Sequence, residues 1–340
     1  MAEQNEQNSQ VKPDVATSVA ADAVVEAADA AGTAGAAETA RAAEVVEAAD
    51  AAGAAEVAGA APSAGAASAA GAAAERPEIL SVRDLKCGYG RGKKYTEIVH
   101  GASFSVRQGE FVCVIGANGC GKTTTLKALM GLLPAHEGVV SVCGVDISGL
   151  SERERARHFA YIPQAHTPPF PFKVADVILL GRTPHINRLA RVTDRDQLIA
   201  LRAMQLLGIE HLADTAYTML SGGQQQLVLI ARALTQQSDI LVMDEPTAAL
   251  DFGNQQLVLS RMRTLSQMGK AVVMVTHDPD HALFCADRVV VMDRGAVIKD
   301  GTPEECITTE MLAHIYGTRA CVVDVRVAAD QSERVCIPLR

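Results

Sequence analysis

The most constraining feature of the sequence is a glycine-rich loop between an apolar run and a helical pattern. The loop reads Gly116-Ala-Asn-Gly-Cys-Gly-Lys-Thr-Thr124, and the apolar run before it is Phe111-Val-Cys-Val-Ile115. The spacing G-x-x-x-x-G-K-[ST] lets successive backbone N–H groups converge on a phosphate at a helix N-terminus, where the helix dipole also favours negative charge. Lys122 is placed to reach the β- and γ-phosphates, and Thr123 to hold Mg²⁺. The pattern therefore predicts a nucleotide-phosphate site on a strand, loop and helix.

The excess of acidic over basic residues is concentrated at the N-terminal end of the chain. Residues 1–75 hold two basic and twelve acidic residues, whereas the rest of the 340-residue chain holds 29 basic and 28 acidic residues. The first segment is rich in Ala and lacks Phe, Tyr and Trp, so it cannot bury enough apolar area to offset chain entropy. We expect residues 1–77 to be a disordered leader. The remainder lacks the basic footprint that nucleic-acid binding usually leaves, and no apolar run is long enough for a membrane span.

Eight cysteines are spread along the chain without a C-x-x-C pair or a metal-ligand spacing. Cys113 in an expected buried strand and Cys120 in the glycine loop are typical of small residues in a reducing cytosol. Of the nine histidines, His277 directly follows an expected buried strand, and we interpret the others as surface or core residues. The cysteine spacing predicts no metal site.

A second glycine stretch, Leu220-Ser-Gly-Gly-Gln224, begins another helical pattern. Ser221 with Gln224 three residues later forms a capping box, and Gly222 with Gly223 permits close approach of the backbone to an anion. Asp251 opens a further helix by the same kind of capping signal. A helix that needed only a cap would not require the doubled glycine, so this stretch predicts a second anion-contacting helix start.

Polar residues follow three expected strands. Asp244 and Glu245 come after the apolar run 240–243. Adjacent carboxylates point in different directions, so one can bind a metal while the other acts on a water molecule. His277 follows the run 271–276, and Gln164 ends the strand pattern that begins at residue 159. Tyr89, between two glycines, could stack on a nucleotide base, although alone it is more typical of a packing tyrosine.

In this order and spacing, the motifs resemble those of the nucleotide-binding subunits of ABC transporters, over about residues 78–302. The Leu-Ser-Gly-Gly-Gln stretch is that family's signature, and it is far more specific than the phosphate loop. The resemblance implies an α/β fold: a P-loop NTPase core with a mainly parallel sheet, an N-terminal antiparallel β-subdomain, and a helical signature subdomain at about 165–224. We therefore expect a leader (1–77), an ATPase domain (78–318) and a C-terminal extension (319–340).

The resemblance also implies a role for each motif residue, with ATP as substrate and Mg²⁺ as cofactor. Glu245 is the expected general base or water-orienting carboxylate, His277 contacts the γ-phosphate, and Gln164 senses the metal and the attacking water. Thr123, Gln164 and Asp244 hold Mg²⁺ directly or through water. The expected ATP-binding residues are Tyr89, Gly116, Ala117, Asn118, Gly119, Cys120, Gly121, Lys122, Thr123 and Thr124. Two subunits pack head to tail, so that the ATP of one is closed by the other's Ser221, Gly222, Gly223, Gln224 and Asp251.

Looser motifs, Leu180-Gly-Arg-Thr-Pro-His185 and Leu312-Ala-His-Ile-Tyr-Gly317, resemble importers of iron–siderophore, haem and vitamin B12 complexes. This implies a homodimer at the cytoplasmic face of the membrane, held there by a separate multi-span permease that works with an extracytoplasmic binding protein. We expect the permease to dock on residues 164–190, with Arg182 exposed, and we expect no nucleic acid. Three alternatives stay open: an importer for another substrate class, a soluble ABC ATPase acting on nucleic acid or ribosomes, and an ATP-binding scaffold without turnover.

Overall fold

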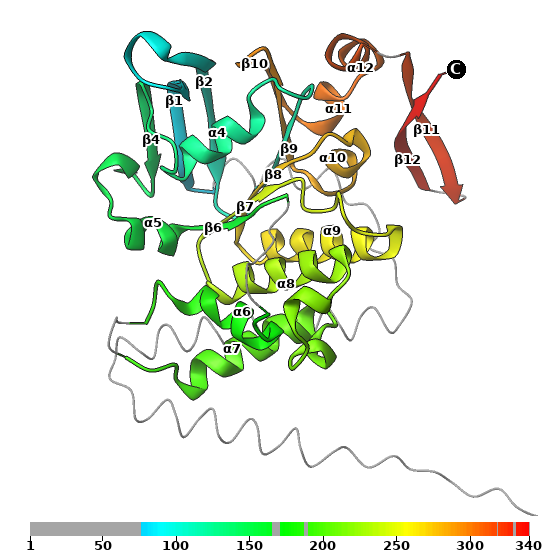
Figure 1. Ribbon diagram of the computed structural model, residues 1–340. Coiled ribbons are helices and arrows are strands. Elements are labelled where there is room, and N and C mark those ends of the chain that lie inside the picture. The colour runs from blue at the N-terminus through cyan, green and yellow to red at the C-terminus, as the bar shows by residue number, and fades with distance from the viewer. Residues whose placement is uncertain (1–75, 165–170, 187–189, 318, 329–330, 340) are drawn as a thin grey trace, which may run out of the picture. The chain divides into compact units, whose positions relative to one another are not determined.

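The phosphate-loop strand lies inside a sheet between two parallel neighbours, β8 (Ala271–Val275) and β9 (Arg288–Asp293), which are labelled in Figure 1. The computed structural model describes residues 76–164, 171–186, 190–317, 319–328 and 331–339. Within these residues the main sheet has six strands in the order β10-β9-β3-β8-β7-β6, and β10 alone runs antiparallel to its neighbour. Its strands are β3 (Phe111–Ile115), β6 (Phe159–Ile162), β7 (Ile240–Asp244), β8 (Ala271–Val275), β9 (Arg288–Asp293) and β10 (Ala296–Gly301).

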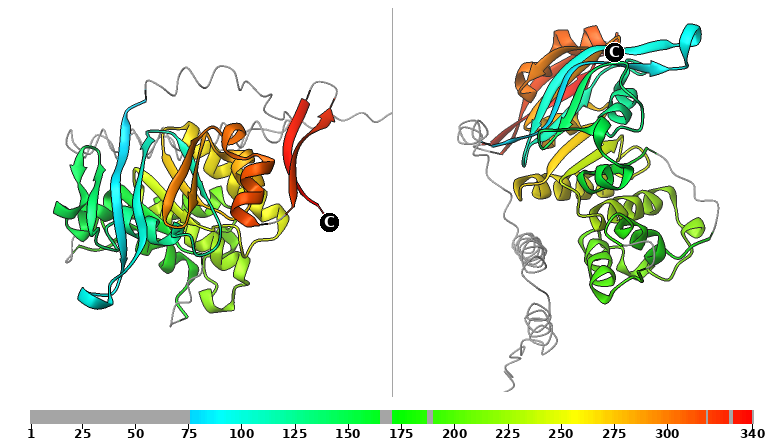
Figure 2. Two further views of the ribbon diagram at one scale, coloured as in Figure 1. Left: turned by 90° about the horizontal axis from the view of Figure 1, so that it is seen from above. Right: turned by 90° about the vertical axis from the view of Figure 1, so that its left-hand side faces the viewer.

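A second, antiparallel sheet with the order β2-β1-β4-β5 covers one side of the main sheet, and Figure 2 shows its cyan and green strands from two further directions. Its strands are β1 (Glu78–Tyr89), β2 (Thr96–Arg107), β4 (Glu137–Val142) and β5 (Val145–Asp146). Alternate side chains of β3 explain the two layers. Val112 and Val114 belong to the core formed with β1, β2 and β4, whereas Phe111, Cys113 and Ile115 belong to the core on the helical side.

Helices account for most of the remaining described chain. The α-helices are α4 (Lys122–Leu129), α5 (Glu152–His158), α6 (Val174–Leu179), α7 (Asp194–Leu206), α8 (Gly222–Thr235), α9 (Phe252–Gln267), α10 (Pro279–Cys285), α11 (Pro303–Cys306) and α12 (Thr309–Tyr316). Single 3₁₀ turns lie at η1 (Gly92–Lys94), η2 (Ile147–Gly149), η3 (Leu180–Arg182), η4 (Glu210–Leu212) and η5 (Tyr217–Met219). Among the residues described, no helix has both the length and the apolar character that crossing a membrane requires.

The expected C-terminal extension contains a hairpin, β11 (Ala320–Ala328) and β12 (Gln331–Pro338). It packs against α10 and α12. The backbone N–H of Cys336 donates to Asp280 Oδ1 at 2.8 Å, which ties β12 to the first turn of α10. The hairpin is therefore attached to the helix that follows His277.

Our expectation that Arg182 is exposed is wrong. Its side chain is buried and pairs with Asp196 Oδ1, with Nε 2.8 Å away. Its Nη1 donates to the carbonyl of Thr235 at 3.1 Å and to Gln237 Oε1 at 2.9 Å. Arg182 thus joins η3 to α7 and to the C-terminal end of α8. Its guanidinium can be buried because charged and polar acceptors surround it.

Candidate active site

The phosphate loop connects β3 to α4, as the sequence predicts. Gly116 is required by close packing, because a Cβ there would lie 2.2 Å from the carbonyl oxygen of Met292. Gly121, the N-cap of α4, has φ +105°, a conformation that favours glycine. No side chain caps the first turn of α4. Its backbone N–H groups are therefore left to an external acceptor, as in helix N-termini that bind phosphate.

Lys122 is buried at the start of α4 and folds back over its own loop. Its Nζ donates to the carbonyl oxygens of Gly116 at 2.7 Å and Ala117 at 3.0 Å. These acceptors lie on the loop that is expected to surround the phosphates. The ammonium is thus held at the position where it can neutralise phosphate charge.

The other loop residues differ in their exposure. Asn118 and Gly119 are exposed at the tip, whereas Thr124 is buried. Cys120 is also buried, and burial raises the pKa of its thiol, so this group is not a reactive thiolate. Tyr89, at the end of β1, is 45% exposed and has an accessible ring.

Asp244 ends β7 as a buried carboxylate beside α4. Burial raises its pKa, although the nearby Thr123 side chain opposes that rise. Tyr161 of β6 lies near Asp244, and burial together with the charge of Asp244 raises the pKa of this tyrosine to about 12. Our sequence reasoning missed Tyr161; the available signal was its place three residues before Gln164 in the same strand pattern.

Glu245 lies between two of the predicted site residues. Gln164 Nε2 donates to its Oε2 at 2.7 Å, and His277 Nδ1 lies 3.2 Å from its Oε1. The backbone of Glu245 has φ 49°, a left-handed conformation that costs a non-glycine residue roughly 1–2 kcal/mol. Its N–H donates to the carbonyl of Val275 at 3.0 Å. The fold therefore brings Gln164, Glu245 and His277 together from the ends of three strands.

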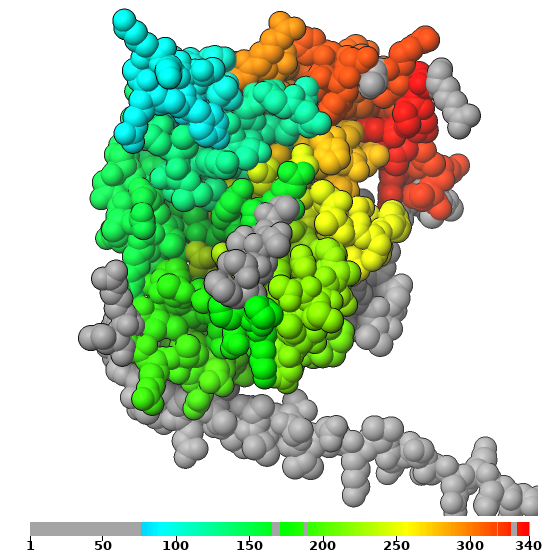
Figure 3. Space-filling model, in the orientation of Figure 1, coloured from blue at the N-terminus to red at the C-terminus, as the bar shows by residue number. Residues whose placement is uncertain are grey.

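The second glycine stretch forms the predicted capping box at the start of α8. Gln224 N donates to Ser221 Oγ at 3.3 Å, and Ser221 N donates to Gln224 Oε1 at 3.0 Å. A Cβ on Gly222 would meet open space, whereas one on Gly223 would lie 3.4 Å from the carbonyl oxygen of Ala249. Figure 3 shows yellow-green side chains from this part of the chain on the face turned to the viewer. Ser221 and Gly222 are both exposed.

Asp251 begins α9, two residues after Ala249. Its side chain accepts hydrogen bonds from the backbone N–H of Asn254 at 2.9 Å and from the Asn254 amide at 2.8 Å. The bond from the Asn254 backbone is the main cause that lowers the pKa of Asp251. The carboxylate is exposed and is used locally as a helix cap.

The predicted residues thus fall into two groups with different surroundings. α4 packs against β1, β2 and β7, whereas α8 packs against β6, α6, α7 and η3. The first group offers backbone N–H donors, an ammonium and a pair of carboxylates, which are the elements of phosphoryl transfer. The second group is a capped, exposed helix start. Together, a phosphate loop after a parallel strand and an acidic pair at a nearby strand end define a P-loop ATPase.

Comparisons with known proteins identify the family. A family model described as ABC transporter matches residues 99–248. An uncharacterized ABC transporter ATP-binding protein of Haemophilus influenzae is 42% identical over 240 residues, which cover 71% of this chain and 90% of that protein. The hemin import ATP-binding protein HmuV of Nocardia farcinica is 41% identical over 237 residues, covering 70% of this chain and 81% of that protein. The chain belongs to the ATP-binding subunits of ABC transporters, which hydrolyse ATP to drive transport.

Solved structures agree with this family. A transporter described as of the metal-chelate type, in an inward-facing conformation, has a chain that matches with a TM-score of 0.68 and 30% identity, covering 78% of this chain and 98% of that chain. A dimeric ATP-binding cassette bound to ADP and Pi matches with a TM-score of 0.60 and 27% identity, covering 66% of this chain and 99% of that chain. The resemblance and fold class expected from the sequence are thereby confirmed.

Proposed function

We propose that this chain is the ATP-hydrolysing subunit of a membrane importer for metal chelates of the iron–siderophore, haem or cobalamin type. The observation that carries the enzymatic part is the Glu245 carboxylate, which is held between Gln164 and His277 next to the buried Asp244. The substrate class is supported by relatives that are named for hemin import and for ferric enterobactin transport. An importer for another substrate class is the second candidate.

In this proposal the phosphate loop and Lys122 bind the β- and γ-phosphates of ATP. The residues present also fit Mg²⁺, because Thr123, Asp244 and Gln164 offer the oxygen ligands that this hard cation prefers. Bound Mg²⁺ neutralises charge on the phosphate oxygens. A cation would also compensate the burial that raises the pKa of Asp244.

Glu245 orients and deprotonates the attacking water, and His277 contacts the γ-phosphate. Gln164 holds the water and the metal shell, which requires it to share or leave its present bond to Glu245. Tyr89 stacks on adenine, for which its exposed ring is suited. The remaining loop residues contribute mainly backbone N–H groups, so a thiol at Cys120 is compatible with phosphate binding.

A head-to-tail dimer completes each site. Ser221, Gly222 and Gly223 of one subunit close over the ATP held by its partner, with Gln224 and Asp251 shaping that surface. The open space at Gly222 leaves room for a phosphate to approach the backbone of α8. A solved cassette dimer supports this arrangement.

The domain boundaries and the location of the chain are part of the same proposal. Residues 1–77 are a leader, 78–318 the ATPase domain with its helical subdomain at about 165–224, and 319–340 an extension. The ATPase sits at the cytoplasmic face of the membrane through a multi-span permease that receives cargo from an extracytoplasmic binding protein. The near-neutral charge of residues 76–340 gives no support to the alternative of a soluble ABC ATPase acting on nucleic acid or ribosomes.

The permease is proposed to dock on residues 164–190, of which 165–170 and 187–189 lie outside the described residues. Since Arg182 is buried, we assign the contact with the permease to the exposed large apolar side chains of the described part of this segment, Phe172 and Leu180. Leu180→Glu should lower transport while leaving hydrolysis by the isolated subunit unchanged. Equal loss of both activities would assign Leu180 to the fold instead.

The deciding experiment is transport by the reconstituted complex. The ATPase, its permease and the binding protein are placed in liposomes and supplied with a ferric hydroxamate, hemin or cobalamin, with Glu245→Gln as the matched inactive control. We expect ATP-dependent uptake of one chelate class by the wild type and none by the variant. Uptake of a different kind of solute would overturn the proposed substrate class. Absence of ATP hydrolysis by the wild type would overturn the assignment of the chain as an ATPase.

A further inference from the structure

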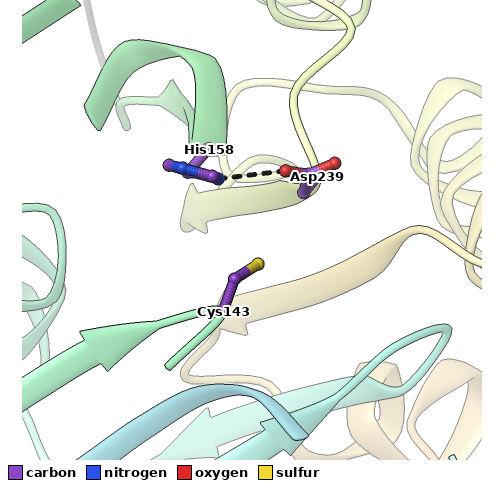
Figure 4. Close-up of side chains that lie close together, drawn as sticks. All are labelled: Cys143, His158 and Asp239. Atoms are coloured by element: carbon purple, nitrogen blue, oxygen red, sulfur yellow. Dashed lines mark hydrogen bonds and ion pairs between the residues drawn. The ribbon is translucent and has the colours of Figure 1, made fainter. Parts of the chain in front are cut away.

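A thiol, an imidazole and a carboxylate meet away from the nucleotide site, although they lie far apart in the sequence. Cys143 lies in the turn between β4 and β5, His158 is the last residue of α5, and Asp239 directly precedes β7. One possible ligand atom from each residue lies within 4.8 Å of the other two. Figure 4 shows the thiol of Cys143 directed toward the His158–Asp239 pair.

Two of the three groups are already held in place. His158 Nδ1 lies 3.0 Å from Asp239 Oδ2. Gln236, three residues before Asp239, donates through Nε2 to the carbonyl oxygens of Ala156 and Phe159, on either side of His158. This fixes the end of α5 against the segment that leads into β7. Preorganised ligands of this kind lower the cost of binding a cation.

The third group can adjust. Cys143 is exposed and has φ 49°, followed by Gly144 at φ 79°, as in a two-residue turn with both residues left-handed. In a tetrahedral zinc site, neighbouring ligand atoms are about 3.4–3.6 Å apart, given zinc–sulfur bonds of about 2.3 Å and zinc–nitrogen or zinc–oxygen bonds of about 2.0–2.2 Å. A shift of the Cys143 side chain by roughly an ångström would bring its sulfur to such distances from the other two ligand atoms.

The donor set selects the kind of cation. Mg²⁺ and Ca²⁺ prefer oxygen ligands throughout, whereas thiolate with imidazole and carboxylate suits Zn²⁺ and similar borderline cations. Burial, with the charge of Asp239, raises the pKa of the Cys143 thiol, and a bound cation would offset both effects. His158 and Asp239 keep 29% and 48% of their side-chain area exposed, so a cation can enter from solvent.

We propose that Cys143, His158 and Asp239 form a binding site for Zn²⁺ or a similar borderline divalent cation, with water as the fourth ligand. On binding, the Cys143 thiol gives its proton to solvent and its sulfur joins the metal, while neutral His158 keeps its proton on the ring nitrogen that does not bind the metal. The cation links the β4–β5 turn of the antiparallel sheet to the start of β7. Asp239 and Asp244 lie at opposite ends of this strand, about 16 Å apart at about 3.3 Å per residue, so the site is separate from that for ATP.

The test is Zn²⁺ binding to the full chain, measured by competition with a chromophoric chelator. We expect one equivalent in the wild type and affinity at least roughly 100-fold weaker in Cys143→Ser, His158→Ala and Asp239→Asn, since even partners one step removed from a metal cost 10–100-fold. The matched controls Cys321→Ser and His211→Ala should retain wild-type affinity. Wild-type affinity in all three cluster variants, or equal loss in the controls, would overturn the site.

Two further measurements keep the test independent of folding. Cys143→Asn removes the thiol but suits the left-handed turn, so this variant should fold at least as well as the wild type. Zn²⁺ should raise the melting temperature of the wild type and of Cys321→Ser but not of Cys143→Asn. With Co²⁺ as probe, a thiolate-to-cobalt charge-transfer band should appear in the wild type and be absent in Cys143→Asn. A band of equal intensity in both would show that the thiolate comes from elsewhere and would refute the assignment.

Discussion

Glycine lies at the N-terminus of both α4 and α8, yet the hydrogen bonding of the two helix starts differs. At α4 the N-cap is Gly121, and no side chain caps the first turn. At α8 the N-cap is Ser221, and a complete capping box with Gln224 satisfies backbone groups of the first turn. The first helix start therefore keeps its donors for a ligand, whereas the second is stable by itself.

This difference matches the two half-sites that we propose. The start of α4 is surrounded by buried groups of its own chain, among them Lys122 and Asp244, so it can bind phosphate before a partner arrives. The start of α8 is exposed and capped, so it can be presented to a second subunit without fraying. Substitutions at the two helix starts should consequently fail in different ways.

The largest expected effect is at α4. Lys122→Ala removes the ammonium that faces the phosphates, and we expect ATP binding and hydrolysis to be abolished while the fold survives. Binding is measured with a fluorescent ATP analogue, and folding by circular dichroism. The control is Lys127→Ala in the last turn of the same helix, which should keep wild-type binding. A folded Lys122→Ala protein with wild-type hydrolysis would show that α4 does not hold the phosphates.

The next effect tests the catalytic carboxylate and the dimer together. Glu245→Gln keeps the size and a hydrogen-bonding side chain but removes the base, so hydrolysis should fall by about 10²–10⁴-fold, the range for a positioned general base. ATP binding should persist. Because ATP is then not consumed, ATP with Mg²⁺ should shift the variant from monomer to dimer in sedimentation velocity.

The same variant separates the roles of the two helix starts. Adding Ser221→Arg places bulk and charge at α8, and it should return Glu245→Gln to the monomer while ATP still binds at α4. Gln205→Arg, at an exposed position of α7, is the matched control and should leave the dimer intact. A Glu245→Gln/Ser221→Arg protein that dimerised with ATP would refute the composite site.

A smaller effect concerns how α8 is anchored. Arg182→Ala leaves Asp196 buried without its cation, so we expect a loss of about 3–5 kcal/mol in the free energy of unfolding, measured by urea denaturation. Arg182→Met with Asp196→Asn removes both charges and retains a hydrogen-bonding side chain at the third residue of α7, where Asp196 completes the capping box of Thr193. The double change should cost less than the single change. A double variant less stable than Arg182→Ala would contradict this account.

The smallest effect should come from the leader. A chain that begins at Pro77 should hydrolyse ATP at the wild-type rate and show the same dimerisation in the Glu245→Gln background. Residues 1–76 are rich in Ala and contain no aromatic residue, so we expect them to contribute nothing to either helix start. Steady-state hydrolysis at saturating ATP checks the first expectation. Loss of turnover in a folded truncated chain would place the leader in the site or the dimer.

Sequence reasoning was sufficient for features encoded over short stretches. The capping box at Ser221, the buried strands and the glycine loop depend on residues within a few positions of one another, so their signals are local. The order of the motifs then predicted the fold class. The meeting of Gln164, Glu245 and His277 could be expected because parallel strands present their carboxyl ends at one edge of a sheet.

Long-range contacts account for what the sequence did not predict. The burial of Arg182 depends on Asp196 in α7 and on Thr235 at the end of α8, which no local pattern relates to it. Cys143 and Asp239 are brought together by the packing of two sheets, so cysteine spacing gave no signal. Tyr161 has an ordinary place in a strand pattern, and its closeness to Asp244 appears only when β6 and β7 pair.

The two carbonyl contacts of Lys122 limit how the ammonium can meet a nucleotide. An ammonium has three N–H donors, so with the oxygens of Gly116 and Ala117 bound one donor is left for a phosphate, and a second phosphate contact requires one carbonyl to be released. All of these bonds are charge-assisted because the donor is an ammonium, but an anionic oxygen adds attraction between opposite charges, and this attraction grows with the charge of the anion. The loop therefore filters anions by charge density, and common cellular anions of low charge should compete poorly with ATP.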